Sequence, residues 1–134
     1  MGVLKLTREK IQKVELINRI SGQSVYDCYQ CGRCTSGCPS ADEMDIVPSQ
    51  TMKFLQIGEV DRVLESNTPW VCLACLVCSV RCPKGIDIAA IMEALRLVKL
   101  RTNYDFIHPN RIPEEDLEEL PPIALVSAFR KMTP

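Results

Sequence analysis

Apolar side chains recur at helical spacing in two long stretches of the sequence, 8–20 and 88–100. The first stretch has Thr7 in front of it as a candidate cap and Gly22 behind it as a stop, and the second follows Asp87, another candidate cap. The stripes consist of Ile11, Val14, Ile17 and Ile20 in the first stretch and of Ile88, Ile91, Met92 and Leu95 in the second. The pattern predicts an amphipathic helix over each stretch.

Two shorter helices are expected between these stretches. One runs over 48–57, with Pro48 in its first turn and Gly58 as its stop, and the other runs over 59–64. The alternation of apolar and polar residues that marks half-buried strands is scarce along the chain. The sequence therefore predicts a mainly α-helical fold.

The character of the sequence changes towards the C-terminus. Residues 103–122 contain four prolines and an acidic run over 114–119, and an apolar run over 123–132 follows. We expect a loop, a short acidic helical turn and a last helix there. The chain is accordingly divided into a domain over 1–102 and an extension over 103–134. The extension either closes the domain's own core or docks to a partner.

Composition narrows the class of protein. Of 134 residues, 25% are charged and the formal net charge is −1, which gives no reason to expect a nucleic-acid or anionic-membrane partner. The most apolar stretch, 71–80, ends at Arg81 and is far shorter than the ~20 residues of a membrane span. The N-terminus does not resemble a signal peptide, so we expect a cytoplasmic location. In a reducing compartment the eight cysteines are expected to bind metal rather than to form disulfides.

The cysteines fall in two runs of identical spacing, each reading C-x2-C-x2-C-x3-C-P. The first run is Cys28, Cys31, Cys34 and Cys38, followed by Pro39, and the second is Cys72, Cys75, Cys78 and Cys82, followed by Pro83. Three cysteines at steps of three on a tightly turning loop direct their thiolates to three corners of one cubane, and N–H groups of the loop offset the charge of the sulfurs. The fourth cysteine lies beyond the turn and reaches the other cluster.

This spacing predicts two [4Fe–4S] clusters with crossed ligands. One cluster is expected on Cys28, Cys31, Cys34 and Cys82, and the other on Cys72, Cys75, Cys78 and Cys38. Eight cysteines saturate two clusters, so no iron is left open to a substrate. The sequence shows no nucleophile–base set, phosphate-binding loop or nucleotide fingerprint. We therefore expect an electron-transfer protein with no catalytic residues of its own.

Other interpretations stay open at this point. A zinc-stabilised binding module is one, although zinc favours two separated pairs of ligands and leaves the third cysteine of each run unused. An independent soluble ferredoxin is another. Trp70 either shields a cluster or packs in the core. The cations nearest the runs, Arg33, Arg81 and Lys84, either stabilise cluster charge or are simply solvated, and His108 is expected at the surface.

Two segments of the sequence resemble one family. The strings CYQCGRCTSGCPSADEMDIVPSQTMKFLQIG and WVCLACLVCSVRCPKGIDIAAIMEALR are similar to the C-subunit of heterodisulfide reductase, over about residues 25–100. The resemblance implies an α-helical ferredoxin domain, in which helices separate the two cysteine runs. The sequence lacks the C-x4-C-x2-C set of related dehydrogenase proteins and the Cys-Cys pair of the catalytic B-subunit of heterodisulfide reductase.

The resemblance also implies a role. The C-subunit of that family passes electrons from an A-subunit, which carries flavin and iron–sulfur clusters, to the disulfide-reducing B-subunit, within a hetero-oligomeric complex of anaerobic metabolism. The terminal substrate in methanogens is the mixed disulfide of coenzymes M and B. Homologous assemblies use other substrates, so the resemblance does not identify the substrate.

Overall fold

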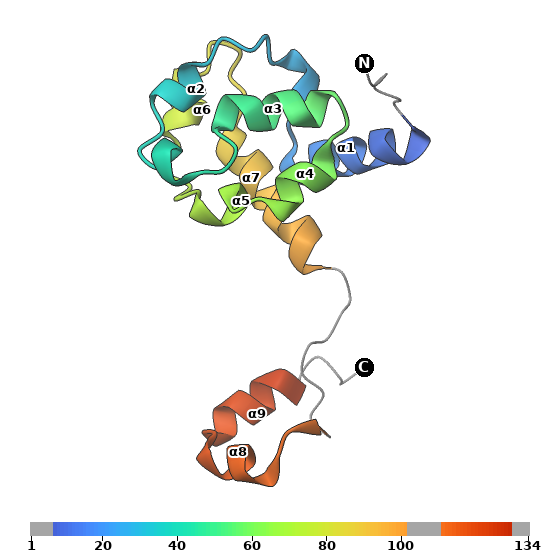
Figure 1. The fold of residues 1–134 in the computed structure, drawn as a ribbon, viewed down its shortest axis with the longest axis vertical. Coiled ribbons are helices and arrows are strands. Elements are labelled where there is room, and N and C mark those ends of the chain that lie inside the picture. Colours follow the sequence, from blue (N-terminus) through green and yellow to red (C-terminus); the bar gives the residue numbers. More distant parts are fainter. Residues whose placement is uncertain (1–6, 102–110, 130–134) are drawn as a thin grey trace. The chain divides into compact units, whose positions relative to one another are not determined.

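The computed structural model describes residues 7–101 and 111–129 of the chain. Contacts divide the chain into two compact units, Met1–Thr102 and Asn103–Pro134 (Figure 1). Every regular element in the described part is a helix, which confirms the predicted mainly α-helical fold. None of the described helices is both long and apolar enough to cross a bilayer.

Helices of very different length build the first unit. Its described α-helices are α1 (Arg8–Ser21), α2 (Arg33–Ser36), α3 (Pro48–Gln56), α4 (Val60–Glu65), α5 (Thr68–Val71), α6 (Val77–Arg81) and α7 (Ile88–Leu100). Two 3₁₀ turns, η1 (Val25–Asp27) and η2 (Ala41–Glu43), complete the set. The ends of α1, α3, α4 and α7 lie within one residue of the predicted ranges, whereas the sequence pattern does not predict α5.

Helix α7 is the central element of the first unit and packs against α1, α4, α5 and α6 (Figure 1). Its Ile91 belongs to one core cluster with Val14 and Ile17 of α1, and all three side chains are fully buried. Each such side chain contributes about 1.5–3 kcal/mol on burial. Ile11 and Ile20 remain 38% and 41% exposed, so only the middle of the predicted α1 stripe enters the core.

The two long helices are closed in different ways. Gly22 ends α1 in the left-handed conformation, as its position predicts. Thr7 is the N-cap residue of α1 as predicted, but its side chain makes no capping hydrogen bond. Asp87 caps α7 as predicted, because its carboxylate accepts the backbone N–H of Ala90 at 3.1 Å.

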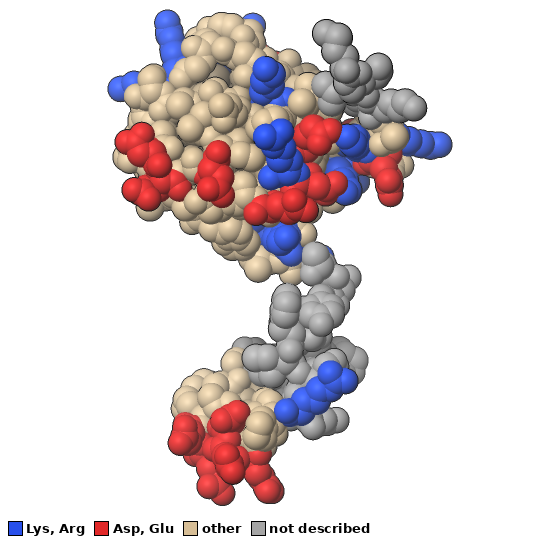
Figure 2. Space-filling model, viewed as in Figure 1, with Lys and Arg blue, Asp and Glu red and all other residues tan. Residues whose placement is uncertain are grey.

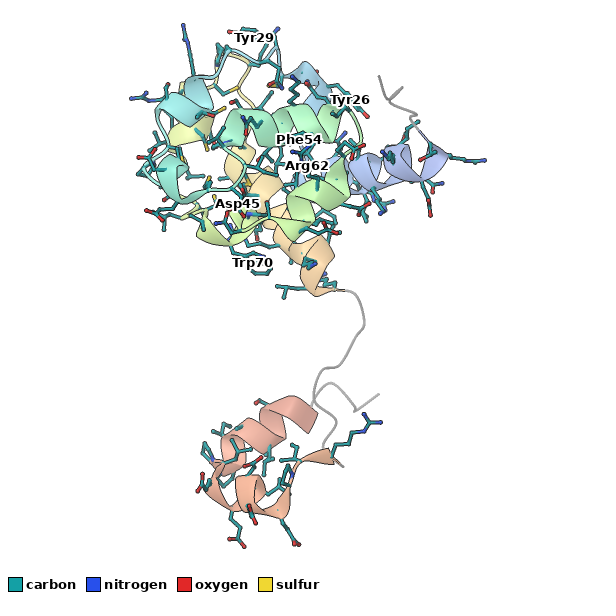
Figure 3. The ribbon with its side chains drawn as sticks, in the orientation of Figure 1. Tyr26, Tyr29, Asp45, Phe54, Arg62 and Trp70 are labelled. Carbon is teal, nitrogen blue, oxygen red and sulfur yellow. The ribbon has the colours of Figure 1, made fainter. Side chains whose placement is uncertain are left out.

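Polar contacts join α4 to its neighbours at the surface. Lys13 of α1 donates to the Asp61 carboxylate at 2.7 Å, and the Arg62 guanidinium lies 4.3 Å from the centre of the Phe54 ring on α3 (Figure 3). Figure 2 shows basic and acidic side chains intermingled over α1 and α4. Exposed pairs of this kind contribute about 0–1 kcal/mol each, so the buried core dominates the stability of the unit.

The second unit contains α8 (Glu114–Glu119) and α9 (Pro122–Phe129) in its described part. Helix α8 coincides with the predicted acidic turn, and its carboxylates gather together in Figure 2. Helix α9 begins one residue before the predicted 123, and the last residues of the predicted range lie outside the described residues. Ile123 and Val126 of α9 are 72% and 57% exposed. His108 lies outside the described residues.

Candidate metal centre

The two cysteine segments follow the same backbone path. The residues two and four positions after the first cysteine of each run are left-handed: Gln30 and Gly32 in one segment (φ +63° and +77°), and Ala74 and Leu76 in the other (φ +51° and +64°). A short helical turn, α2 or α6, follows at once. Successive turns of this kind direct backbone N–H groups and side chains towards one point, which suits an anionic group.

The eight cysteines line two hollows. The Cys28 hollow, of about 310 Å³, is lined by four of them: Cys28, Cys31, Cys34 and Cys82. The Cys72 hollow, of about 380 Å³, is lined by the other four: Cys38, Cys72, Cys75 and Cys78. Each hollow therefore takes three cysteines from one run and the fourth from the other run. The structure brings together the same two sets that the spacing predicts as ligand sets.

The thiols differ in exposure and acidity. Cys31 and Cys75, the middle cysteines of the two loops, are exposed, whereas Cys34 is only 7% exposed. Burial raises the pKa of Cys34, and burial likewise raises the pKa of Cys78. The backbone N–H of Arg33 lowers the pKa of the exposed Cys31. Thiolate, the form that binds metal, is thus easier to form at Cys31 than at an ordinary cysteine, whereas burial opposes it at Cys34 and Cys78, where the charge of a bound metal would stabilise it.

The two hollows differ in the types of residue that line them. Gln30, Arg33 and Ser49 contribute to the lining of the Cys28 hollow. The lining of the Cys72 hollow includes Ser40 but otherwise consists, besides the cysteines, of apolar residues such as Met44, Leu73 and Met92. Ile88, the first residue of α7, is 3% exposed and contributes to both linings. The hollows are therefore neighbours that share a buried apolar wall.

The first residues of α3 and α7 contribute to the linings of the hollows. Helix α3 places Pro48 in the lining of the Cys72 hollow and Ser49 in that of the Cys28 hollow, and α7 places Ile88 in both. The N-terminal ends of these helices carry a partial positive charge. Their approach to both hollows favours negatively charged occupants.

Two hydroxyl residues tie the cysteine segments to these helix starts, and our sequence reasoning missed them. Thr35 Oγ1 accepts the backbone N–H of Ser49 at 2.9 Å. The Ser79 hydroxyl donates to the Asp87 carboxylate at 2.7 Å. Thr35 and Ser79 each follow the third cysteine of their run, so a hydroxyl residue at matching places was the signal in the sequence.

The remaining candidates fall in different places. Arg33 lines the Cys28 hollow, and Arg81 lies against Gly37 on the contact between α2 and α6. Lys84 is exposed. Trp70 is 49% exposed, so it does not pack in the core, and it is absent from the linings of both hollows. Figure 3 shows Trp70 and Tyr29 at opposite edges of the first unit.

The donor set fits iron–sulfur clusters. All eight cysteines are free thiols, and four of them line each of two adjoining hollows. Among the described residues, no three histidine, cysteine or acidic side chains converge closely enough to surround a single metal ion. Thiolates are the protein ligands of [4Fe–4S] clusters, and a site with apolar walls and inward N–H groups suits such a group.

Comparison with known proteins agrees with this chemistry. A family model described as the 4Fe-4S dicluster domain matches residues 27–87, which include all eight cysteines. The iron-sulfur C-subunit of CoB–CoM heterodisulfide reductase from Methanopyrus kandleri is 40% identical over 81 residues, which are 60% of this chain and 42% of the relative.

Two further relatives come from Methanosarcina, and both are C-subunits of a ferredoxin:CoB-CoM heterodisulfide reductase. The protein of Methanosarcina acetivorans is 43% identical over 70 residues, covering 52% of this chain and 28% of the relative. The protein of Methanosarcina mazei is 30% identical over 102 residues, covering 75% and 62%. The chain thus matches less than two thirds of the length of these relatives. It matches the 4Fe-4S dicluster domain over residues 27–87 and is similar to the iron-sulfur C-subunits of heterodisulfide reductases.

Proposed function

We propose that the chain holds one [4Fe–4S] cluster in each hollow and relays electrons between two larger proteins of one hetero-oligomeric complex. The donor would resemble the A-subunit of heterodisulfide reductase, with flavin and iron–sulfur clusters, and the acceptor would resemble the B-subunit, which reduces a disulfide. One observation carries the proposal: each hollow is lined by a complete set of four cysteines, three from one run and one from the other.

The residues of the chain have separate tasks in this proposal. The four thiolates of each hollow would hold a cluster, which takes up and releases single electrons when it is bound. The left-handed loops supply N–H groups to the sulfurs, and the starts of α3 and α7 offset the negative charge. Ile88 and the other apolar walls exclude water from the space between the clusters.

Two features of the surface support a relay rather than a store of electrons. Each hollow has one exposed cysteine, Cys31 or Cys75, so each cluster would approach the surface at its own side. Tyr29, inside the first run, and Trp70, two residues before the second run, lie at opposite edges of the unit (Figure 3). Electrons would therefore enter near one cluster and leave near the other.

The chain itself is proposed to be non-catalytic. Two cubanes would use all eight cysteines, so neither cluster would offer an open iron to a substrate sulfur. Cleavage of a disulfide takes two electrons, whereas a cluster passes one at a time. The disulfide chemistry is therefore assigned to the partner that resembles the B-subunit, while this chain contributes binding, placement and electrostatics.

Replacing the fourth cysteine of each run tests the ligand sets. Cys38→Ser should perturb the cluster of Cys72, Cys75 and Cys78 and leave the other nearly intact, and Cys82→Ser should do the reverse. Electron paramagnetic resonance of the anaerobically reduced variants reports each cluster separately. Loss of the cluster within the same run, in either variant, would show that the ligands are not crossed.

Reconstitution tests the relay. The isolated reduced chain should pass electrons to a generic acceptor dye yet leave a heterodisulfide untouched until the disulfide-reducing partner is added. Anaerobic copurification should recover both the flavin-bearing and the disulfide-reducing protein with the chain, whereas an independent ferredoxin would purify alone. Steady disulfide turnover by the chain alone, with dithionite as electron donor, would contradict the proposal that the chain is non-catalytic.

A further inference from the structure

Gly37 and Arg81 occupy equivalent positions in the two cysteine runs. Each stands immediately before the fourth cysteine of its run, Cys38 or Cys82. Gly37 follows the short helix α2, Arg81 is the last residue of the short helix α6, and the two helices pack against each other. The two equivalent positions meet at this contact, because the Arg81 side chain lies directly on Gly37.

A side chain at position 37 would collide with the flexible end of Arg81, which would have to move aside. A Cβ atom on Gly37 would lie 2.6 Å from Cδ, 2.8 Å from Nε and 3.0 Å from Nη1 of Arg81. The backbone of Gly37 has φ −104°, a conformation that any residue adopts, so glycine is not needed there for its backbone freedom. The absence of a side chain at Gly37 instead provides the space in which Arg81 lies.

This position brings one cation next to both ligand sets. The backbone of Arg81 adjoins Cys82, which lines the Cys28 hollow. The guanidinium end of the same side chain lies on the residue that adjoins Cys38, which lines the Cys72 hollow. Arg81 itself is exposed and belongs to neither lining, so it would act on both clusters from outside the hollows, whereas Arg33 lines the Cys28 hollow alone. In the described part of the chain Arg81 forms no ion pair with a carboxylate, so its charge is not neutralised there.

We propose that the positive charge of Arg81 stabilises the reduced form of both clusters. We also propose that Gly37, by having no side chain, leaves the space that keeps Arg81 near both. The inference rests on the proposed function, since it requires a cluster in each hollow. Reduction adds one negative charge to a cluster, and a nearby cation stabilises the reduced form. Arg81 therefore raises the reduction potentials of the two clusters together, which keeps electron transfer between them balanced.

The experiment measures the reduction potential of each cluster by anaerobic titration with electron paramagnetic resonance. Arg81→Gln should lower both potentials, and Arg81→Lys should retain most of the wild-type values. Gly37→Ala keeps the charge but displaces the guanidinium, so it too should lower both. Arg33→Gln should lower only the potential of the cluster in the Cys28 hollow. Lys84→Gln removes an exposed cation that does not lie on Gly37, and it should shift both potentials less than Arg81→Gln does.

An exchange of the two residues provides a second arm. The double variant Gly37→Arg with Arg81→Gly moves the cation to the equivalent place across the same contact and should restore both potentials. The inference is overturned if Arg81→Gln has normal iron content and shifts neither potential, or shifts only one. It is likewise overturned if the Arg81→Gln shifts are no larger than those of Lys84→Gln. A wild-type chain that binds no iron–sulfur cluster would instead refute the proposed function.

Discussion

Four residues in the cysteine loops adopt the left-handed backbone conformation, and only one of them, Gly32, is a glycine. For other residues this conformation costs about 1–2 kcal/mol. This conformation is nevertheless present at Gln30, Ala74 and Leu76, because the loop has to direct its thiols and N–H groups inwards. Local strain at the candidate site is thus a direct consequence of its geometry.

Gly32 and Leu76 offer a matched test of this strain. No atom lies within 4 Å of a Cβ placed on Gly32, so Gly32→Ala should lower stability by about 1 kcal/mol through backbone strain alone. Leu76, at the equivalent left-handed position, is 50% exposed, and Leu76→Gly should therefore be neutral or slightly stabilising. Anaerobic thermal unfolding of the cluster-bearing chain compares them. An equal loss in both variants would contradict the argument.

The sequence predicted some features of the candidate site and missed others. The cysteine sets follow from spacing alone, because a repeated C-x2-C-x2-C-x3-C-P motif constrains the directions of its thiols locally. The contact of Arg81 with Gly37 depends on how α2 and α6 pack, which no local pattern specifies. The sequence likewise left open whether Trp70 packs in the core, because its exposure is set by tertiary packing.

At the scale of elements, the N-cap residues of α1 and α7 can be compared by mutation. Asp87→Ala should destabilise the chain by about 1 kcal/mol, because the Ala90 N–H loses its acceptor and Ser79 loses its partner. Thr7→Ala is the matched control and should change little, since Thr7 makes no capping hydrogen bond. Thermal unfolding at neutral pH measures both. Equal losses for the two caps would be inconsistent with the structure.

The Asp87 cap also has a defined pH dependence. The Ser79 hydroxyl, with the Ala90 N–H, holds the pKa of Asp87 below its usual value. A lowered carboxyl pKa gives stability that is present above the unfolded pKa and is lost as the pH falls through the folded pKa. The difference between wild type and Asp87→Ala should thus persist at neutral pH and shrink only below about pH 4. A difference that grew on acidification would contradict this assignment.

A helix could be predicted from the sequence where residues within or beside it determine its range, and not where a distant contact does. The ranges of α1 and α7 follow from apolar periodicity and nearby stop or cap residues. Helix α5 depends on a distant partner: the Thr68 hydroxyl donates to the Ile46 carbonyl at 2.8 Å and accepts the Ile46 N–H at 3.0 Å. A four-residue helix fixed by such a bond leaves no periodic signal in the sequence.

The different walls of the two hollows predict unequal potentials. The apolar lining of the Cys72 hollow disfavours the extra negative charge of the reduced cluster, whereas Gln30, Arg33 and Ser49 favour it in the Cys28 hollow. The cluster on Cys38, Cys72, Cys75 and Cys78 should therefore have the lower reduction potential. A redox titration that assigns the higher potential to this cluster would refute the prediction.

At the scale of the whole molecule, the extension over 103–134 is proposed to dock to a partner. Exposed Ile123 and Val126 on α9 are the kind of side chains that interfaces cover. Deleting residues 121–134 should weaken recovery of the complex while the iron content of the chain stays unchanged. As a control, Ile123→Ser with Val126→Ser should weaken recovery in the same direction. A complex recovered in full after the deletion would remove the docking role.

The central claim is that this chain carries two [4Fe–4S] clusters on eight cysteines. Iron and acid-labile sulfide, measured per chain on the anaerobically purified protein, test it most directly. The account predicts about eight of each, because two cubanes hold four irons and four sulfides apiece. Zinc without labile sulfide, or about four irons per chain in fully loaded protein, would contradict it.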